Sequence, residues 1–385
     1  MKLKSFAMIS AICAGSVSLA SAQQYVYLTG STAFRGTVYA TLNSTAVFDT
    51  APTFVGYNGS SASGCNFMLF SNTIASTPTI IKCHWSGSEA GILDVSSSTQ
   101  ESFLSDTVIP GGTQLGTTPS GSQLITNGVD LAMADNAVAF SQNPGSSASQ
   151  TFVGVIPFSW VRGSNNLASV SNLTNVTDQQ IRKALAGGQK LALFTGVPTD
   201  TTNYVYVSGR DNGSGTRVNA FGISGYGIKT PPFQIELDGT GNMINLDGAG
   251  TYDGDYGFSS GGTLAGTLGI DTSGSADQVH TGNTGFVTIA YLGRSDANTA
   301  VNKGGIELSY NGVKESPTTI MEGQYGFWGN EYVLQRSGAS SQAQAVYTKL
   351  KATTGIPASC DGVIAFNNTQ MHATRGGPTT DPQHK

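Results

Sequence analysis

Short apolar runs in this chain pass repeatedly through turns of small residues into segments whose apolar positions fall at helical spacing. The first run, Tyr25–Leu28, consists of residue types that are typical of a strand, and it leads through Thr29–Phe34 into such a segment. A second run, Ile80–Trp85, leads through Ser86–Gly91 in the same way. Strands that alternate with helices in this order predict an α/β protein.

The same order continues along the rest of the chain. The clearest helix, Gln179–Ala186, follows the capping residue Thr177 and stops at Gly187-Gly188. Residues 233–263 are rich in Gly and Asp and predict an irregular hairpin region, whereas the last dozen residues are polar with prolines and are expected to fray. Further strands are predicted at Val129–Ala134, Thr151–Phe158, Tyr204–Val207 and Phe286–Leu292, and another is predicted at or after Trp328.

The size and composition of the chain fit an exported protein with a substantial core. Its 385 residues, 38% of them hydrophobic, suffice for two ordinary domains or one large two-lobed domain. Only 11% are charged, against about 25% in an average soluble domain, so solubility must come from Ser, Thr, Asn and the 50 Gly residues. The formal charge of −5 argues against nucleic-acid binding through a general basic surface.

The first 22 residues predict a secretory signal peptide. Lys2 and Lys4 precede an apolar run over Phe6–Ala14, and the small residues that follow end in Ala20-Ser21-Ala22, an A-x-A cleavage pattern. The run is too short to cross a bilayer, which takes about 20 apolar residues. We therefore expect cleavage after Ala22 and a mature protein in the periplasm or outside the cell.

Three cysteines follow the predicted signal peptide. Cys65 and Cys83 flank two short strand-like runs, so a disulfide that staples a hairpin is expected in an oxidising compartment, with Cys360 left over. A structural zinc site is not expected, because there is no C-x-x-C motif and the four histidines are scattered.

Four turns share small residues, hydroxyls and glycines at the point where a strand gives way to a helix. They are Thr29–Phe34, Ser86–Gly91, the turn at Asp135, and Gly209–Thr216. Such turns present backbone N–H groups at a helix N-terminus, where the helix dipole favours an anion, and Ser or Thr adds a hydroxyl donor. Together the four turns predict a site for a tetrahedral oxyanion that is held mostly by neutral donors.

The turns also carry motifs in a defined order. Gly30–Phe34 follows the first strand, Gly87-Ser88 opens the second turn, and Gly128–Asp135 contains the third. The segment Arg210–Thr216 is similar to an Arg-x-Asp-Gly-Ser-Gly-Thr element. In these motifs, over about residues 25–335, the chain resembles the phosphate-binding proteins of ABC importers, which are type II periplasmic binding proteins.

The resemblance implies a ligand site made of these turns. Arg210 would supply the full positive charge, and charge-assisted contacts of this kind contribute about 1.5–3 kcal/mol each. Asp135 would be the selective member, because an ionised carboxylate beside an anion is repulsive unless the anion donates a proton to it. Phosphate carries such a proton at neutral pH and sulfate does not. The neutral donors would be the Thr32 hydroxyl, the Ala33 N–H, both donors of Ser88, and Ser214, Gly215 and Thr216.

Several positions depart from the family pattern. Asn212 stands where the family has an Asp that pairs with the arginine, and Asp211 is the nearby substitute. Glu89 follows Ser88 and is expected to point outward. Arg35 is an additional cation whose side chain is expected to be solvated, with contact to the ligand or neutralisation of Glu89 as the alternatives, and segments 45–80 and 236–256 are identified as insertions.

The fold that the resemblance implies is α/β with two lobes, each a mixed sheet flanked by helices, joined by a hinge of two crossing strands. Lobe I would be residues 25–155 plus 328–385, and lobe II residues 156–327. The function implied is capture of inorganic phosphate between the lobes for the membrane subunits of an ABC permease. We expect a monomer that is not an enzyme and that needs no metal or other cofactor.

Two other functions are open to the sequence. An exported surface or adhesion protein could reuse the fold without transport, consistent with the Gly/Ser/Thr/Asn-rich composition. Gly257–Gly261 matches the G-x-S-x-G pattern of serine hydrolases and His280 follows it, but no strand leads into the segment, so we expect the start of a helix there. The Asp-Gly pairs between 238 and 255 lack the spacing of calcium loops and are interpreted as surface turns.

Overall fold

The computed structural model describes residues 22–384 except 98, 144–147, 166, 246–250, 272–276, 281, 284, 353–358, 361–362 and 365–369. Residues 1–21 of the predicted signal peptide lie outside the described residues. The described helices are α1 (Arg35–Leu42), α2 (Ser88–Ser96), α3 (Asp178–Leu185), α4 (Ala192–Thr195), α5 (Gly215–Ile223), α6 (Gly261–Leu268), α7 (Arg294–Asn302), α8 (Pro317–Met321) and α9 (Ser341–Leu350).

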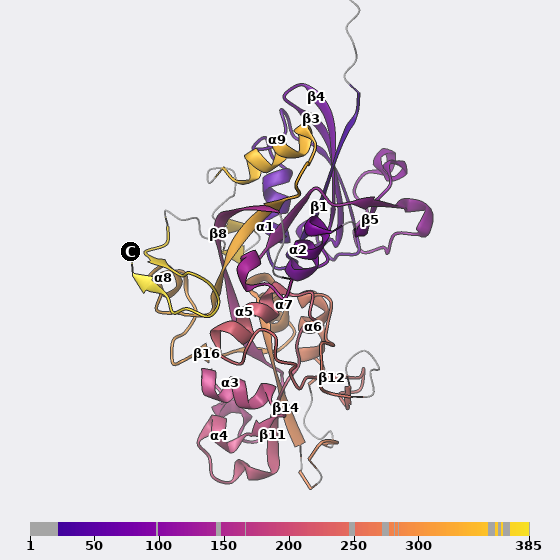
Figure 1. The fold of residues 1–385 in the computed structure, drawn as a ribbon. Helices are drawn as coiled ribbons and strands as arrows, with labels where there is room; N and C mark the ends of the chain where they lie inside the picture. Colours follow the sequence, from indigo (N-terminus) through magenta and orange to yellow (C-terminus); the bar gives the residue numbers. More distant parts are fainter. Residues whose placement is uncertain are drawn as a thin grey trace, which may run out of the picture.

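A single mixed sheet of 11 strands organises the molecule (Figure 1). Strands β1 and β4, β1 and β7, and β11 and β14 pair in parallel, and the other pairs in the sheet are antiparallel. The order across it is β10 (Gln189–Lys190), β11 (Asn203–Val207), β14 (Gly285–Gly293), β8 (Ser149–Arg162), β17 (Trp328–Gln335), β7 (Leu131–Ala134), β1 (Gln24–Gly30), β4 (Thr77–His84), β3 (Phe67–Ile74) and β2 (Thr53–Tyr57), with β15 (Ile306–Glu307) also on β8.

Small two-stranded sheets lie beside the main one. They are β5 (Gln100–Leu104) with β6 (Leu124–Gly128), β9 (Asn175–Val176) with β16 (Ser309–Tyr310), β12 (Ile235–Leu237) with β13 (Met243–Asn245), β18 (Ser359–Cys360) with β19 (Val363–Ile364), and β20 (Ala373–Thr374) with β21 (Gln383–His384). The predicted α/β class is therefore confirmed, and the strands predicted from the sequence are all present.

Helices cover both faces of the main sheet, as the alternation of buried residues requires. In β1, Val26 and Leu28 share a core cluster with residues of α1 and α9, whereas Tyr27 packs with residues of α2. Successive side chains of a strand point to opposite faces, so these helices lie on opposite sides of the sheet. In the same way, α3 covers one face of β11 and β14, and α6 and α7 cover the other face of β14 together with β8.

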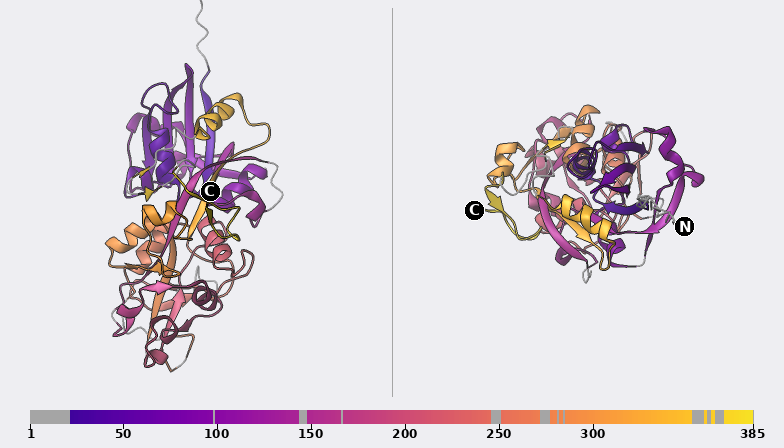
Figure 2. Two further views of the ribbon diagram at one scale, coloured as in Figure 1. Left: turned by 90° about the vertical axis from the view of Figure 1, so that its left-hand side faces the viewer. Right: turned by 90° about the horizontal axis from the view of Figure 1, so that it is seen from above.

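Strand β8 joins the two ends of the sheet, which we call the first half (β1–β4 and β7 with α1 and α2) and the second half (β10, β11 and β14 with α3–α7). Its residues 149–157 pair with β17, and its residues 158–162 pair with β14. The change of partner falls at Pro157, which has no N–H to donate. The left view of Figure 2 shows an elongated molecule, and Figure 1 shows the two halves above and below the region of β8.

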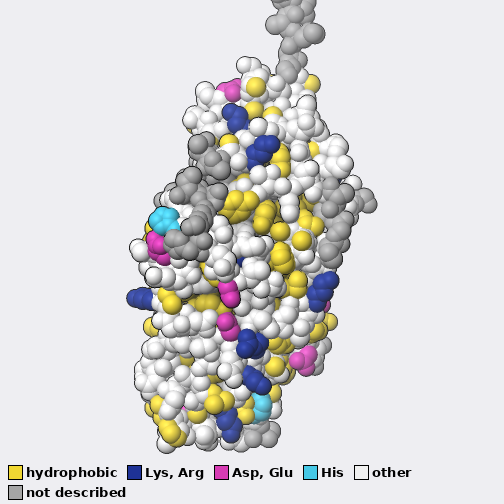
Figure 3. Space-filling view, turned by 60° about the vertical axis from the view of Figure 1, so that its left-hand side comes forward, with side chains coloured by type: hydrophobic (Ala, Val, Ile, Leu, Met, Phe, Trp, Pro, Cys, Tyr) yellow, Lys and Arg dark blue, Asp and Glu magenta, His cyan; other side chains and the backbone are white. Residues whose placement is uncertain are grey.

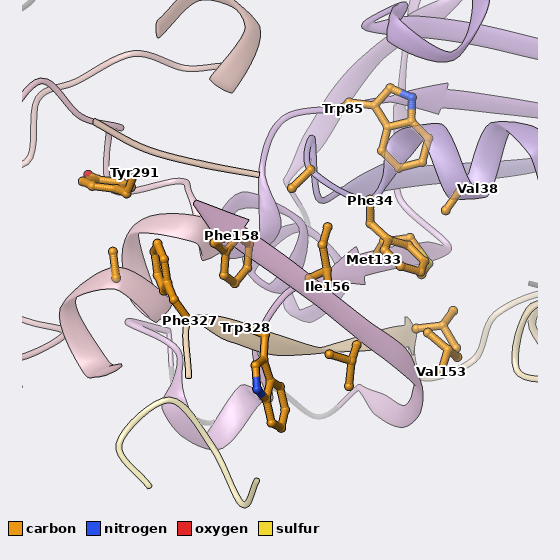
Figure 4. Close-up of a cluster of buried hydrophobic side chains, with 14 of the residues drawn as sticks. Phe34, Val38, Trp85, Met133, Val153, Ile156, Phe158, Tyr291, Phe327 and Trp328 are labelled. Atoms are coloured by element: carbon orange, nitrogen blue, oxygen red, sulfur yellow. The ribbon is translucent and has the colours of Figure 1, made fainter. Parts of the chain in front are cut away.

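Aromatic side chains, among them Phe158 and Phe327, pack where β8 and β17 cross between the halves (Figure 4). Trp160 stacks on Phe327 with ring centroids 5.8 Å apart and meets Tyr291 edge-on at 5.5 Å. Arg375 lies 4.6 Å from the centre of the Trp328 ring and donates to the Trp328 carbonyl at 2.6 Å. The expectation that the last dozen residues fray is therefore wrong for the described part, because Arg375 is buried against the crossing strands.

The disulfide predicted between Cys65 and Cys83 is also wrong. Both residues are buried and carry free thiols. The β3–β4 register places Cys83 opposite Met68, while the Cys65 thiol donates to the Ser61 carbonyl at 3.3 Å. Burial raises the pKa of Cys65 to about 11, so the thiol is protonated at neutral pH.

The surface agrees with the low charge content. Figure 3 shows charged side chains that are few and scattered over the visible face, most of which is uncharged and polar or apolar. Among the described residues, none of the helices combines the length and the hydrophobicity needed to cross a bilayer.

Asp94 supplies a test of the packing of α2. It is buried near the charge of Glu101, and burial raises its pKa to about 7. The folded protein thus holds this proton up to about pH 7, whereas the unfolded chain releases it above about pH 4, so stability falls as pH rises between these values. We expect Asp94→Asn to be more stable than wild type, by a margin that grows by about 1–3 kcal/mol between pH 5 and pH 8. Urea unfolding at the two pH values measures this, and a margin independent of pH would contradict it.

Candidate functional site

Five helices begin where the two halves meet, α1 and α2 from the first half and α5, α6 and α7 from the second (Figure 1). The turns before α2 and α5 are hydrogen-bonded to each other, because the N–H of Glu89 donates to the Gly213 carbonyl at 2.9 Å. The turn before α1 packs on the start of α7, where a Cβ at Gly293 would lie 2.8 Å from that of Ala33. Converging helix N-termini direct N–H groups and partial positive charge toward one region.

The carboxylate of Asp135 lies at the centre of this junction. It follows β7 directly, is buried, and accepts hydrogen bonds from the hydroxyl of Ser31 and, at 3.3 Å, from that of Thr216. Its own N–H donates to Ser88 Oγ at 3.1 Å, and its carbonyl accepts from Asn219 Nδ2 at 2.9 Å. Asp135 therefore contacts residues of three separate turns, two in the first half and one in the second.

The turn before α5 approaches the first half closely. A Cβ on Gly215 would lie 2.4 Å from Ser88 Oγ, so only glycine lets the two turns meet in this way. Ser214 is the N-cap of α5, and its hydroxyl accepts from the Arg217 N–H at 3.2 Å. Of the three predicted donors in this turn, Thr216 contacts Asp135, Gly215 contacts Ser88, and the Ser214 hydroxyl caps its helix.

Arg210 lies on the side of the junction formed by α6 and α7. Its guanidinium is buried and donates to the carbonyls of Phe258 and Ser259, each at 2.8 Å. It acts electrostatically on Asp296, a buried carboxyl group in the first turn of α7, together with Arg35. Burial raises the pKa of Asp296, and the two guanidinium groups oppose that shift.

Thr32 and Ala33 are buried in the turn between Ser31 and α1. Ser31 donates to Asp135, while Ala33 contacts Gly293 at the start of α7. This turn thus links the side of the junction that holds Asp135 to the side that holds Arg210. The ligand contacts expected of Thr32 and Ala33 stay predictions.

Glu89 is placed differently from the sequence expectation, whereas the ligand contact considered for Arg35 stays a prediction. The expectation that Glu89 points outward is wrong: it is buried and accepts from Asn136 Nδ2 at 2.8 Å, Ser141 Oγ at 2.7 Å and the Gln142 N–H at 2.7 Å. These donors satisfy the carboxylate, although burial raises its pKa. The described partners of Arg35 are Asn66, through a hydrogen bond, and the charges of Asp296 and Arg210.

Asp211 has a clear local role. Its Oδ1 accepts from the Gly213 N–H at 3.0 Å and so shapes the turn before α5. An acid that the sequence reasoning missed, Asp296, also faces Arg210. The sequence signal for Asp296 was a fifth passage from strand to helix, where Gly293 ends β14 and is the N-cap of α7.

Two further residues of the junction were missed. Ser31 stands beside the predicted Thr32 in the same turn, and its hydroxyl donates to Asp135. Which of the two hydroxyls points to Asp135 depends on the backbone geometry of the turn. Glu331 lies fully buried in β17 next to Asp135. A single acid within an otherwise uncharged strand sequence, Trp328–Gln335, was the only signal for it.

A polar pocket of ≈ 400 Å³ opens beside Arg35. The starts of α6 and α7 form one wall, and residues 58–66, which belong to a predicted insertion, form the other. Lys303 is a second cation of the lining, which contains no acid. The lining thus combines two cations with the starts of two helices.

The G-x-S-x-G segment begins a helix, as expected. Ser260 is the N-cap of α6, and the Ser259 carbonyl accepts from Arg210. His280 hydrogen-bonds Tyr206 through Nδ1 at 2.5 Å and stacks on Tyr204. Within the described residues, no group of three or more His, Cys, Asp and Glu side chains is arranged to hold a metal ion.

Comparisons with known proteins give structural matches only. No protein-family model matches the chain, and no curated protein matches it. The structure is similar to that of a putative phosphate ABC transporter substrate-binding protein with bound phosphate from Clostridium perfringens, with 14% identity, coverage of 86% of this chain and 94% of that chain, and a TM-score of 0.49. It is also similar to an ABC-type phosphate transport receptor from Vibrio cholerae, with 13% identity and a TM-score of 0.44, and to PstS from Borrelia burgdorferi, with 13% identity and a TM-score of 0.38. Each of these two matches covers 86% of this chain and 94% of the other chain.

Gly215 supplies a test of the contact between the halves. Gly215→Ala places a methyl group against Ser88, and we expect it to destabilise the protein by about 1–3 kcal/mol because the turns must separate. Ser88→Gly in the same chain removes the clashing atoms and should restore most of the loss. Gly239→Ala is the matched control, since a Cβ there meets nothing within 4 Å. Thermal unfolding measures the effect, and equal stability of the 215 and 239 variants would contradict the contact.

Proposed function

We propose that this chain is an extracytoplasmic solute-binding protein that captures inorganic phosphate between two lobes and delivers it to the membrane subunits of an ABC permease. The lobes are residues 25–155 plus 328–385 and residues 156–327. The ligand lies at the junction of α1, α2, α5, α6 and α7. No covalent chemistry is needed for this function.

The observation that carries the proposal is the buried carboxylate of Asp135 among hydroxyl donors from both halves of the chain. A lone carboxylate repels an anion, so a partner at this position must bring a proton of its own. The hydroxyls of Ser31 and Thr216 can rotate to donate to that anion instead of to Asp135. Phosphate can both donate a proton to Asp135 and accept hydrogen bonds from these hydroxyls, whereas fully ionised sulfate can only accept.

The positive potential for a bound anion has two sources. Arg35 and Arg210 supply formal charge, part of which is balanced by Asp296. The N-termini of the five helices supply partial positive charge. A local arrangement of this kind binds an anion even in a chain with a net charge of −5.

Capture and release follow from the way the halves are joined. Strands β8 and β17 are the long strands that lie between them, and contacts such as Gly215 with Ser88 join the two sides directly. A ligand that contacts both sides at once stabilises the closed arrangement. Release then requires the contacts across the junction to open.

The site residues can be tested by comparing phosphate with sulfate. Arg210→Gln removes a charge and should weaken phosphate binding by about 10- to 100-fold, because a charge-assisted contact is lost. Asp135→Asn should weaken phosphate binding less and raise the affinity for sulfate, because the amide donates to an oxygen that carries no proton. Isothermal titration calorimetry with both anions measures these changes.

Lys229→Gln is the control for the loss of one positive charge, since Lys229 is exposed outside the junction. It should bind both anions like wild type. Sulfate binding by wild type as tight as phosphate binding would remove the argument from Asp135. Failure of wild type to bind phosphate at all would refute the proposed function.

A further inference from the structure

Glu331 is a buried acid that has no role in the proposed phosphate site. It lies in β17, its side chain is 0% exposed, and both of its carboxyl oxygens lack a hydrogen-bond donor. An ionised carboxylate left in this condition costs several kcal/mol. Its presence therefore needs an explanation in terms of a proton or a partner.

The sheet register places Glu331 beside Asp135. Strands β17 and β7 are antiparallel and pair Val333 with Met133 and Tyr332 with Ala134, so the next positions in line are Glu331 and Asp135. Residues directly opposite in such a pair have Cβ atoms about 4.5–5.5 Å apart. The Glu331 carboxyl group lies within hydrogen-bonding reach of that of Asp135.

A bulge next to Glu331 leaves this arrangement intact. The pairing of β17 with β8 shifts between Glu331 and Tyr332, from Gly154 on β8 to Phe152. The extra residue, Val153, lies on β8, so β17 keeps its regular alternation and Glu331 stays on the face that its register with β7 gives it. A Cβ at Gly329, two residues before Glu331, would lie 2.9 Å from the Asp135 carbonyl, so β17 approaches Asp135 closely here.

We propose that Glu331 carries a proton that it donates to Asp135, and that this hydrogen bond keeps Asp135 an ionised acceptor and so sets the preference for oxyanions that bring a proton. The inference rests on the proposed function for its ligand, while the hydrogen bond itself does not. Two carboxyl oxygens in contact are both acceptors, and a proton between them turns repulsion into a strong hydrogen bond. The donor set of Asp135 is then Ser31, Thr216 and Glu331.

The surroundings decide which of the two acids keeps the proton. Asp135 has two hydroxyl donors that stabilise its charged form, whereas Glu331 has none. Burial first, and then the negative charge of Asp135, raises the pKa of Glu331 well above its ordinary value. Asp135 is the described group whose charge acts on Glu331, whereas the charges of Arg35 and Arg210 act on Asp296. The residues that contact Asp135 from the turn before α1 and from α5 are uncharged: Ser31, Thr216 and Asn219.

The consequence for selectivity follows from this assignment. With the proton held on Glu331, Asp135 offers an oxygen that can only accept, and a sulfate ion meets repulsion there. If Asp135 itself became protonated, it would donate to sulfate and the discrimination would be lost. Glu331 is thus a positioning residue that determines specificity through Asp135.

Two substitutions separate the proton from the shape of the side chain. Glu331→Gln keeps a donor toward Asp135 but cannot titrate, and it should keep the phosphate-to-sulfate affinity ratio within about twofold of wild type at pH 8 and pH 5.5. Glu331→Met fills a similar volume without a donor. It should weaken phosphate binding by at least about tenfold and admit sulfate at pH 5.5, because Asp135 then loses the donor that holds it as an acceptor.

Titration calorimetry of both anions at the two pH values measures these ratios, with Glu101→Gln as a matched control, since Glu101 pairs with His84 at 2.6 Å outside the junction. Unchanged ratios and pH profiles in Glu331→Met would overturn the specificity role. A loss of discrimination in Glu331→Gln equal to that in Glu331→Met would overturn it as well.

A second measurement needs no ligand. The infrared difference spectrum of wild type minus Glu331→Gln at pH 8 should contain the carbonyl band of a protonated carboxylic acid. A band of an ionised carboxylate in its place would refute the proton on Glu331. If wild type shows the acid band but binds no phosphate, the proposed function and the specificity role fail while the hydrogen bond between the two acids stands.

Discussion

A buried carboxylate surrounded by donors from different parts of the chain organises the junction of this protein. Asp135 accepts from Ser31 and Thr216, and it donates through its N–H to Ser88. Burying a charge is costly unless hydrogen bonds replace the lost water, so these donors must converge whenever Asp135 is ionised. The same requirement brings the turns before α1, α2 and α5 together, and with them the helix N-termini that suit the site to an anion.

The sheet makes this convergence possible because it holds both halves in one hydrogen-bonded framework. Strand β8 pairs with β14 of the second half along residues 158–162 and with β17 along residues 149–157, and β17 pairs in turn with β7 of the first half. The aromatic cluster around Trp160 and Phe327 and the buried Arg375 stiffen the crossing.

Much of the architecture could be predicted from the sequence, because the signals are short-range. The runs at Tyr25–Leu28 and Ile80–Trp85 and the cap at Thr177 predicted elements that the structure contains. The inward orientation of Glu89 could not be predicted, since its donors come from the loop around Ser141, far away in the sequence. The free thiols of Cys65 and Cys83 likewise depend on a strand register that residue spacing does not reveal.

By itself, the sequence determined the succession of strands and helices and the small-residue turns between them, including the position of Asp135 after a buried strand. Backbone sterics and side-chain periodicity act over a few residues, so these features are readable along the chain. Only the tertiary structure decided which side chains surround that carboxylate, Ser31 from the turn before α1 and Glu331 from the neighbouring strand, and that Asp296 lies near Arg210. These neighbours come from pairing and packing between distant segments, where a shift of one position in register would turn Glu331 to the opposite face of the sheet.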